Sequence, residues 1–114
     1  MLESEVIKLE GDIVILDLRG RLTLGSRLSL LEAEIATLTG SGSTKIILDL
    51  EKVEYADSAA LGVLLHASGA VRSKGGQLLL ASPNQRLQEL FDLTNTATLL
   101  PSHPDRATCI ARLS

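Results

Sequence analysis

Apolar residues along the chain fall into short continuous runs and into stripes with helical spacing. The runs predict strands at Val6-Ile7, residues 13–18, 45–50 and 77–81, and a last short strand at residues 97–100. Gly11 supplies the turn between the first two strands, and Gly20 is predicted to end the second. Residues 51–56 are predicted to form a loop. The run at 45–50 is almost wholly apolar, which is typical of a strand covered on both faces.

The apolar stripes predict helices over residues 25–38, 59–73 and 85–93 and one at the C-terminus. In the first of these, Leu28, Leu31, Ile35 and Leu38 recur at spacings of three, four and three. The C-terminal helix should carry Pro104 in its first turn and turn Ala107, Ile110, Ala111 and Leu113 inward. This order of elements predicts one α/β domain over residues 1–114, with a small mixed sheet of about four to five strands packed with three to four helices.

Composition excludes several function classes. The net charge is −3 and aromatic residues make up 2% of the chain, which argues against a nucleic-acid binder. The apolar runs are too short for membrane insertion, and the acidic first residues predict no export leader, so the expected compartment is the cytoplasm. The lone Cys109 can form neither an internal disulfide nor a cysteine-based zinc site. His66 and His103 lie on different predicted helices, and no cluster predicts a cofactor, a metal or an enzyme active site.

The segment around Ser58 is the most informative part of the chain. Asp57 and Ser58 are both favourable N-cap residues, so the Ser58 hydroxyl should lie at the surface where the helix begins. Leu61, Leu64, Leu65 and Ser68 should form the core face of this helix. The opposite face collects Ala59, Gly62, Val63, His66, Ala70 and Ser73, with no charged residue among them. Such a face is either a docking surface or covered by the same domain, and Ser58 is either a modified residue or only a cap.

Four short motifs occur in an order that resembles one family. Asp57-Ser58-Ala59-Ala60-Leu61-Gly62 is similar to the D-S-x-x-L-G signature of the STAS domain, the fold of bacterial anti-sigma-factor antagonists. The stretches at 20–23, 75–80 and 90–94 resemble the family's G-x-L turn, its glycine pair with the following strand, and its L-F-x-L-T sequence. The sequence departs from the pattern in two respects: Ala59-Ala60 replaces a common Ser-Gly pair, and Thr23 replaces a common acidic residue.

The resemblance implies a partner-switching regulator of transcription. An unphosphorylated antagonist binds an anti-sigma factor with serine kinase activity and is released when that partner phosphorylates the serine at the position of Ser58; a serine phosphatase reverses the change. The implied partner surface comprises Asp57, Ser58, Ala59, Gly62, Val63, His66 and Thr23. The alternative is a STAS subunit of a transport or signalling complex that is never phosphorylated, in which Ser58 is only a cap and contact residue.

Overall fold

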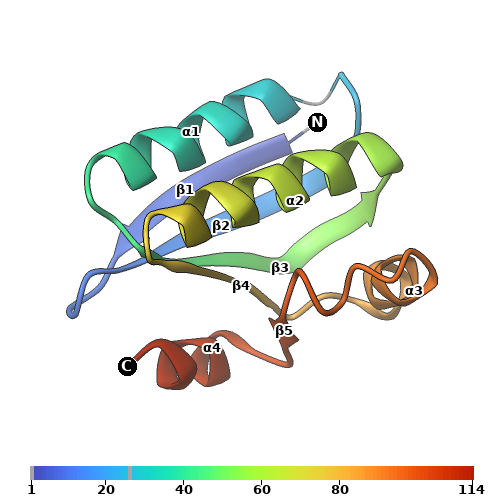
Figure 1. Ribbon diagram of the computed structural model, residues 1–114. Coiled ribbons are helices and arrows are strands. Elements are labelled where there is room, and N and C mark those ends of the chain that lie inside the picture. The colour runs from blue at the N-terminus through green and yellow to red at the C-terminus, as the bar shows by residue number, and fades with distance from the viewer. Residues whose placement is uncertain (1, 26) are drawn as a thin grey trace.

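The computed structural model describes residues 2–25 and 27–114, which form a five-stranded mixed sheet and four helices (Figure 1). The sheet order is β1-β2-β3-β4-β5; β1 is antiparallel to β2 and the remaining pairs are parallel. The elements are β1 Leu2–Lys8, β2 Ile13–Leu22, α1 Leu28–Gly40, β3 Lys45–Ala56, α2 Ser58–Ser73, β4 Gln77–Ala81, α3 Gln85–Leu93, β5 Ser102–His103 and α4 Arg106–Leu113. The predicted class, strand number and helix number are confirmed.

The turn between β1 and β2 forms as the sequence predicts. Gly11 and Asp12 both adopt positive φ, at 77° and 62°, and the Leu9 N–H donates to the Ile13 carbonyl at 2.8 Å. Glycine adopts this backbone region without a steric penalty, and aspartate tolerates it better than most residues. The first residues of the predicted helix 25–38 do not belong to α1, which begins at Leu28; residue 26 lies outside the described residues.

Strands β2 and β3 are longer than the sequence predicts. The predicted end of β2 at Gly20 is wrong, as is the predicted loop at 51–56, because the two strands stay paired as far as Leu22 and Ala56. Two register shifts in this stretch keep the pairing while the strands bend, and Gly20 takes up one of them with a φ of 106°. The extended pairing brings the residues after β2 next to the residues after β3.

The C-terminal segment departs from prediction in three respects. Residues 97–100 form a turn and no strand, and the last strand is β5, which pairs with Leu80 and Ala81 of β4. Asp105 caps α4, so Pro104 precedes the helix and does not occupy its first turn. Leu113 is buried and Ile110 half-buried as expected, but Ala107 and Ala111 are exposed. The helix lies on the sheet through Cys109 and Leu113, four residues apart on one face.

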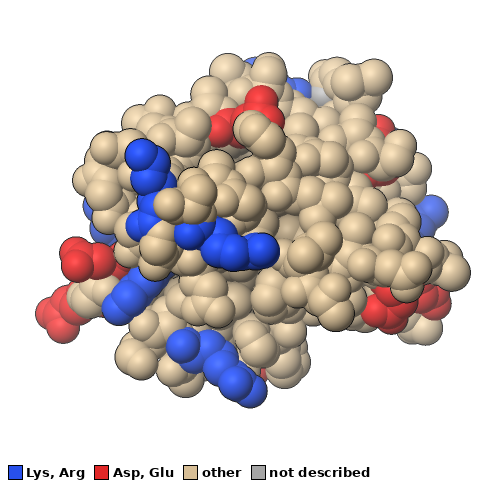
Figure 2. All heavy atoms as spheres, viewed as in Figure 1, with Lys and Arg blue, Asp and Glu red and all other residues tan. Residues whose placement is uncertain are grey.

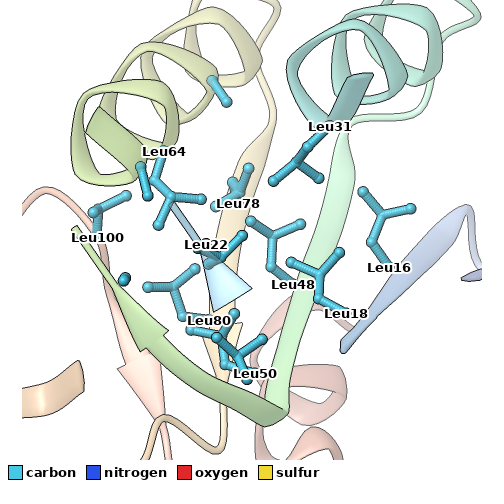
Figure 3. Packing of buried hydrophobic residues seen from close by; sticks show 14 of the residues in the cluster. Leu16, Leu18, Leu22, Leu31, Leu48, Leu50, Leu64, Leu78, Leu80 and Leu100 are labelled. Carbon is cyan, nitrogen blue, oxygen red and sulfur yellow. The ribbon is translucent and has the colours of Figure 1, made fainter. Parts of the chain in front are cut away.

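The helices divide the core into two parts. Helices α1 and α2 cover one face of the sheet and α4 covers the other (Figure 1). The larger cluster is rich in leucine from the strands, with Leu31 of α1 and Leu64 of α2 packed onto it (Figure 3). The smaller cluster places Cys109 and Leu113 over Ile15, Ile47 and Leu79. Strand β3 is therefore buried on both faces along its first half, as its apolar run predicts.

An ion pair between a half-exposed arginine and a buried carboxylate connects α4 to the sheet. Asp17 and Asp49 are register neighbours on β2 and β3, and both side chains are almost fully buried. Arg106, the first residue of α4, donates to Asp49 from Nε at 2.9 Å, and its Nη2 lies 2.8 Å from the same oxygen. Lys52 Nζ lies 3.5 Å from the carboxylate of Asp17. Buried carboxylates need such partners, because an unpaired charge in the interior is strongly unfavourable.

Candidate functional site

Asp57 lies between β3 and α2 in the chain, and its carboxylate accepts hydrogen bonds both from the segment after β2 and from the first turn of α2. Its Oδ1 accepts a hydrogen bond from the Ala60 N–H at 2.9 Å, which makes Asp57 the N-cap of the helix. Its Oδ2 accepts from the Leu24 N–H at 3.0 Å, and its own N–H donates to the Leu22 carbonyl at 3.0 Å. Ser58 is the first helical residue, so the interpretation of Ser58 as the cap is wrong; the carboxylate of the preceding residue performs that function.

The backbone N–H groups around Asp57 also fix its charge. The donor from Leu24 and then the donor from Ala60 lower the pKa of the Asp57 carboxyl below its ordinary value, because both bonds favour the ionised form. A negative charge therefore stands beside Ser58 at neutral pH.

Replacement of Asp57 by alanine should destabilise the fold by about 1 kcal/mol at pH 7, the typical contribution of an N-cap. Because the pKa of Asp57 is lowered in the folded state, its contribution is present above the ordinary value of 3.8 and disappears as the pH falls below it. Urea unfolding of the wild-type chain and Asp57→Ala at a series of pH values should therefore show a difference that shrinks in acid. A difference that persists unchanged in acid would contradict the assignment.

Ser58 is exposed at the start of α2. Within the described part of the chain its Oγ has no hydrogen-bond partner, so the hydroxyl is available to an incoming group. It opens onto a shallow groove of about 400 Å³ between the start of α2 and α3. The groove is lined by Tyr55, Ala56, Asp57, Ser58, Arg86, Leu87, Glu89, Leu90 and Leu93. Leu93 is 84% exposed, so the groove has an apolar rim on the α3 side.

The outward face of α2 is rotated from the predicted one. Gly62, His66, Ala70 and Ser73 are exposed as expected, but Ala59 and Val63 are half-buried and pack against the core. Gly69 is an exposed residue that the prediction missed.

On the inner face of α2, Leu61, Leu64 and Ser68 are buried as predicted, whereas Leu65 is only half-buried. Ala60, Ala67 and Val71 are buried as well. Helix α2 packs against α1 and β4.

The exposed surface over α2 carries little charge. In Figure 2 tan atoms cover most of the area right of the centre, most of the Lys and Arg atoms lie left of the centre, and acidic atoms lie at the top and at the lower right. An acidic group reaches this surface from the neighbouring helix: Glu32 of α1 lies 3.3 Å from Nδ1 of His66. The exposed residues of the predicted face, Gly62, His66, Ala70 and Ser73, include no Asp, Glu, Lys or Arg, but α2 also exposes Arg72 in its last turn, and α1 adds one carboxylate at the border of the face.

Thr23 and Leu24 complete the surface on the other side of Ser58. Thr23 is half-buried directly after β2, and Leu24 is 79% exposed while its N–H is held by Asp57. The fold therefore brings Thr23, Asp57 and Ser58 together, while His66 lies two helical turns further along α2. Sequence reasoning missed Leu24 and the α3 side of the groove; an apolar residue inside the turn at 23–25 was the available signal for Leu24.

Replacement of glycine by alanine should raise the stability of the fold at one position and lower it at another. A Cβ at Gly62 would meet nothing within 4 Å, so Gly62→Ala should stabilise the helix by about 1 kcal/mol. A Cβ at Gly76 would lie 2.8 Å from the Cα of Thr44, so Gly76→Ala should destabilise the fold. Thermal unfolding of the two variants beside the wild type measures both changes; a destabilised Gly62→Ala would show that this position is not open.

The described residues show no group of three or more His, Cys, Asp or Glu side chains able to hold a metal ion. Cys109 is buried, its thiol donates to the Leu80 carbonyl at 3.5 Å, and burial raises its pKa to about 11, so it stays protonated. Within the described ranges, none of the helices combines the length and the apolar character needed to cross a bilayer.

Comparison with known proteins adds three relatives. A family model of the STAS domain matches residues 5–109. BtrV of Bordetella bronchiseptica, a candidate anti-sigma factor antagonist, is 31% identical over 71 residues, which are 62% of this chain and 61% of BtrV, so the chain spans less than two thirds of that relative. A crystal structure of a candidate anti-sigma factor antagonist from Thermotoga maritima superposes with a TM-score of 0.89 at 25% identity, covering 96% of this chain and 93% of that one. The phosphorylated form of SpoIIAA from Bacillus superposes with a TM-score of 0.76, covering 98% and 100%; at 19% identity this similarity shows the fold alone.

Proposed function

Since the chain belongs to the STAS domain family, we propose that it is an anti-sigma-factor antagonist controlled by phosphorylation of Ser58. The observation that carries the proposal is the exposed Ser58 hydroxyl at the start of α2, without a hydrogen-bond partner among the described residues and next to an uncharged helix face. BtrV, which is a candidate anti-sigma factor antagonist, supports the proposed role.

In this proposal the unphosphorylated chain binds an anti-sigma factor with serine kinase activity in the cytoplasm. The partner covers Thr23, Asp57, Ser58 and the exposed first half of α2 as far as His66, with Gly62 allowing close approach of its backbone; Ala59 and Val63 border the contact. The chain acts by binding and performs no catalysis of its own. Its occupation of the partner frees the sigma factor for transcription.

The chemical step belongs to the partner. Ser58 Oγ attacks the γ-phosphorus of ATP, a new O–P bond forms, and the bond to the departing ADP oxygen breaks, while the serine proton passes to a base on the kinase. The product carries about −1.5 to −2 charges at Ser58. The helix N-terminus tolerates an anion, so the fold should persist. Burial of the phosphate against an apolar partner beside Asp57 is unfavourable, so the partner dissociates until a serine phosphatase removes the group.

Phosphate labelling tests the proposal. The unphosphorylated chain is used to isolate its partner from extracts of the producing cell, and the purified partner is incubated with radiolabelled ATP and the chain. We expect stoichiometric labelling of the wild type and of Ser73→Ala, a matched serine at the far end of α2, and none of Ser58→Ala. Labelling of Ser58→Ala would move the site elsewhere. A tightly bound partner that transfers no phosphate would favour the alternative, an unphosphorylated STAS subunit of a transport or signalling complex.

A further inference from the structure

The groove beside Ser58 contains a guanidinium that has no acidic partner. Arg86, the second residue of α3, lies with its Cζ 5.3 Å from the centre of the Tyr55 ring, a cation–π arrangement. Among residues 2–25 and 27–114 no carboxylate lies within ion-pair distance of Arg86. Both Arg86 and Ser58 line the same groove of about 400 Å³.

The start of α3 is fixed against the strand that leads to Ser58. Asn84 caps α3 by accepting from the Leu87 N–H at 2.8 Å, and its Nδ2 donates to the carbonyls of Val53 and Glu54, each at 3.2 Å. One side chain therefore ties the first turn of α3 to the last residues of β3. Because Ser58 follows Glu54 by only four residues, Arg86 is held near Ser58 by short, hydrogen-bonded connections.

The other charged groups at the groove leave Arg86 as the available cation. Asp57 and Glu89 line the same groove, and the adjoining hollow of about 340 Å³ is lined by Arg21, Glu54, Tyr55 and Arg86. Arg21 is already paired, with its Nε 3.6 Å from the Glu54 carboxylate. A phosphoryl group on Ser58 would add about two negative charges beside Asp57, so a nearby cation would be strongly favoured.

We propose that Arg86 binds the phosphoryl group of phosphorylated Ser58 within the same molecule. The guanidinium turns from the Tyr55 ring to the phosphate and donates two N–H groups to its oxygens, the bidentate geometry that arginine forms with phosphate. This inference rests on the proposed function, since it describes the modified state of Ser58. It assigns to α3 the task of holding the phosphate in the groove that the unmodified chain leaves open.

The chain itself supplies a reporter for this movement. It contains one tyrosine and no tryptophan, so Tyr55 alone gives the aromatic signals of a hydroxylated ring. Departure of Arg86 from the Tyr55 ring on phosphorylation should change the chemical shifts of the ring protons. The phosphate should in turn show a lowered second pKa, because a neighbouring guanidinium favours the dianion.

The test uses the full chain with phosphoserine installed at position 58 during its synthesis, so that no kinase is needed. Phosphorus NMR titrations should give the phosphate in Arg86→Gln a second pKa higher by roughly half a pH unit than in the wild type, from an ordinary value of about 6. The Tyr55 resonances should move on phosphorylation in the wild type but not in Arg86→Gln. Arg86→Lys should restore part of the pKa difference, and Arg112→Gln, an exposed arginine on α4, should behave as wild type.

Identical phosphate titrations for the wild type and Arg86→Gln would overturn the inference. That result leaves the proposed function standing, since a kinase could still modify Ser58. Conversely, a chain that no partner phosphorylates contradicts the proposed function while this measurement remains valid, because the phosphate is introduced chemically. The two failures are therefore distinguishable.

Discussion

A phosphoryl group on Ser58 should weaken binding of the chain to the anti-sigma partner of the proposed function by roughly a hundredfold or more, which corresponds to about 3 kcal/mol. The physical reason is desolvation: the group carries a charge of about −2 beside the ionised Asp57, and the proposed contact surface on the first half of α2 offers it no Lys or Arg side chain of that helix. Isothermal titration of the purified partner with the phosphorylated and unphosphorylated chains measures the difference.

Two variants control this experiment. Ser58→Glu should weaken binding in the same direction but less, because one carboxylate carries less charge and fewer acceptor oxygens than a phosphate. Ser73→Glu places the same charge at the last residue of α2, about 22 Å along the helix at 1.5 Å per residue, and should leave the affinity within a few-fold of wild type. Equal affinities of the phosphorylated and unphosphorylated chains would show that Ser58 is not the switch.

Arg106→Met should destabilise the fold by about 3 kcal/mol, because it leaves the buried carboxylate of Asp49 without its cation. Among the described residues, Asp49 would then keep the hydrogen bond from the Glu51 N–H at 3.0 Å. For a domain of this size the loss corresponds to a fall in melting temperature of roughly 10 °C. Thermal and urea unfolding measure it, and the effect should exceed that of any single change at the exposed face of α2.

The matched control is Arg112→Met, which changes an exposed arginine of the same helix and should shift stability by less than about 0.5 kcal/mol. The double variant Asp49→Asn with Arg106→Met removes the buried charge together with its partner and should recover part of the loss. If Arg106→Met and Arg112→Met destabilised the fold equally, the pair with Asp49 would make no special contribution.

Local signals in the sequence were sufficient for much of the site. The spacing of apolar residues predicted the bounds of α2, α3 and β4 to within one residue. Each helix buries a regular apolar stripe, and β4 is a continuous apolar run. The pair Asp57-Ser58 after an apolar run marked a helix start, and the structure has one there. The choice between the two residues as cap required coordinates, because both side chains are able to cap a helix.

The pattern of residues did not predict how far β2 and β3 remain paired. The sequence pattern predicted the end of β2 at Gly20 and a loop at residues 51–56, yet the two strands remain paired to Leu22 and Ala56 through two register shifts that no local pattern indicates. The orientation of α2, which half-buries Val63 and exposes Gly69, is set in the packed molecule, where α2 contacts α1 and β4. Residue spacing in one helix defines which side chains share a face, but the neighbouring element decides how that face is turned.

The amino-acid sequence by itself determined the class of fold, the order of its elements and the position of a serine at the start of a helix. These features follow from hydrophobic periodicity and from helix capping, which involve only a few neighbouring residues. Only the tertiary structure decided what surrounds that serine. Leu24 meets Asp57 across 33 positions and Arg86 shares a groove with Ser58 across 28, and such neighbours are created by strand pairing and helix packing rather than by any pattern within one segment.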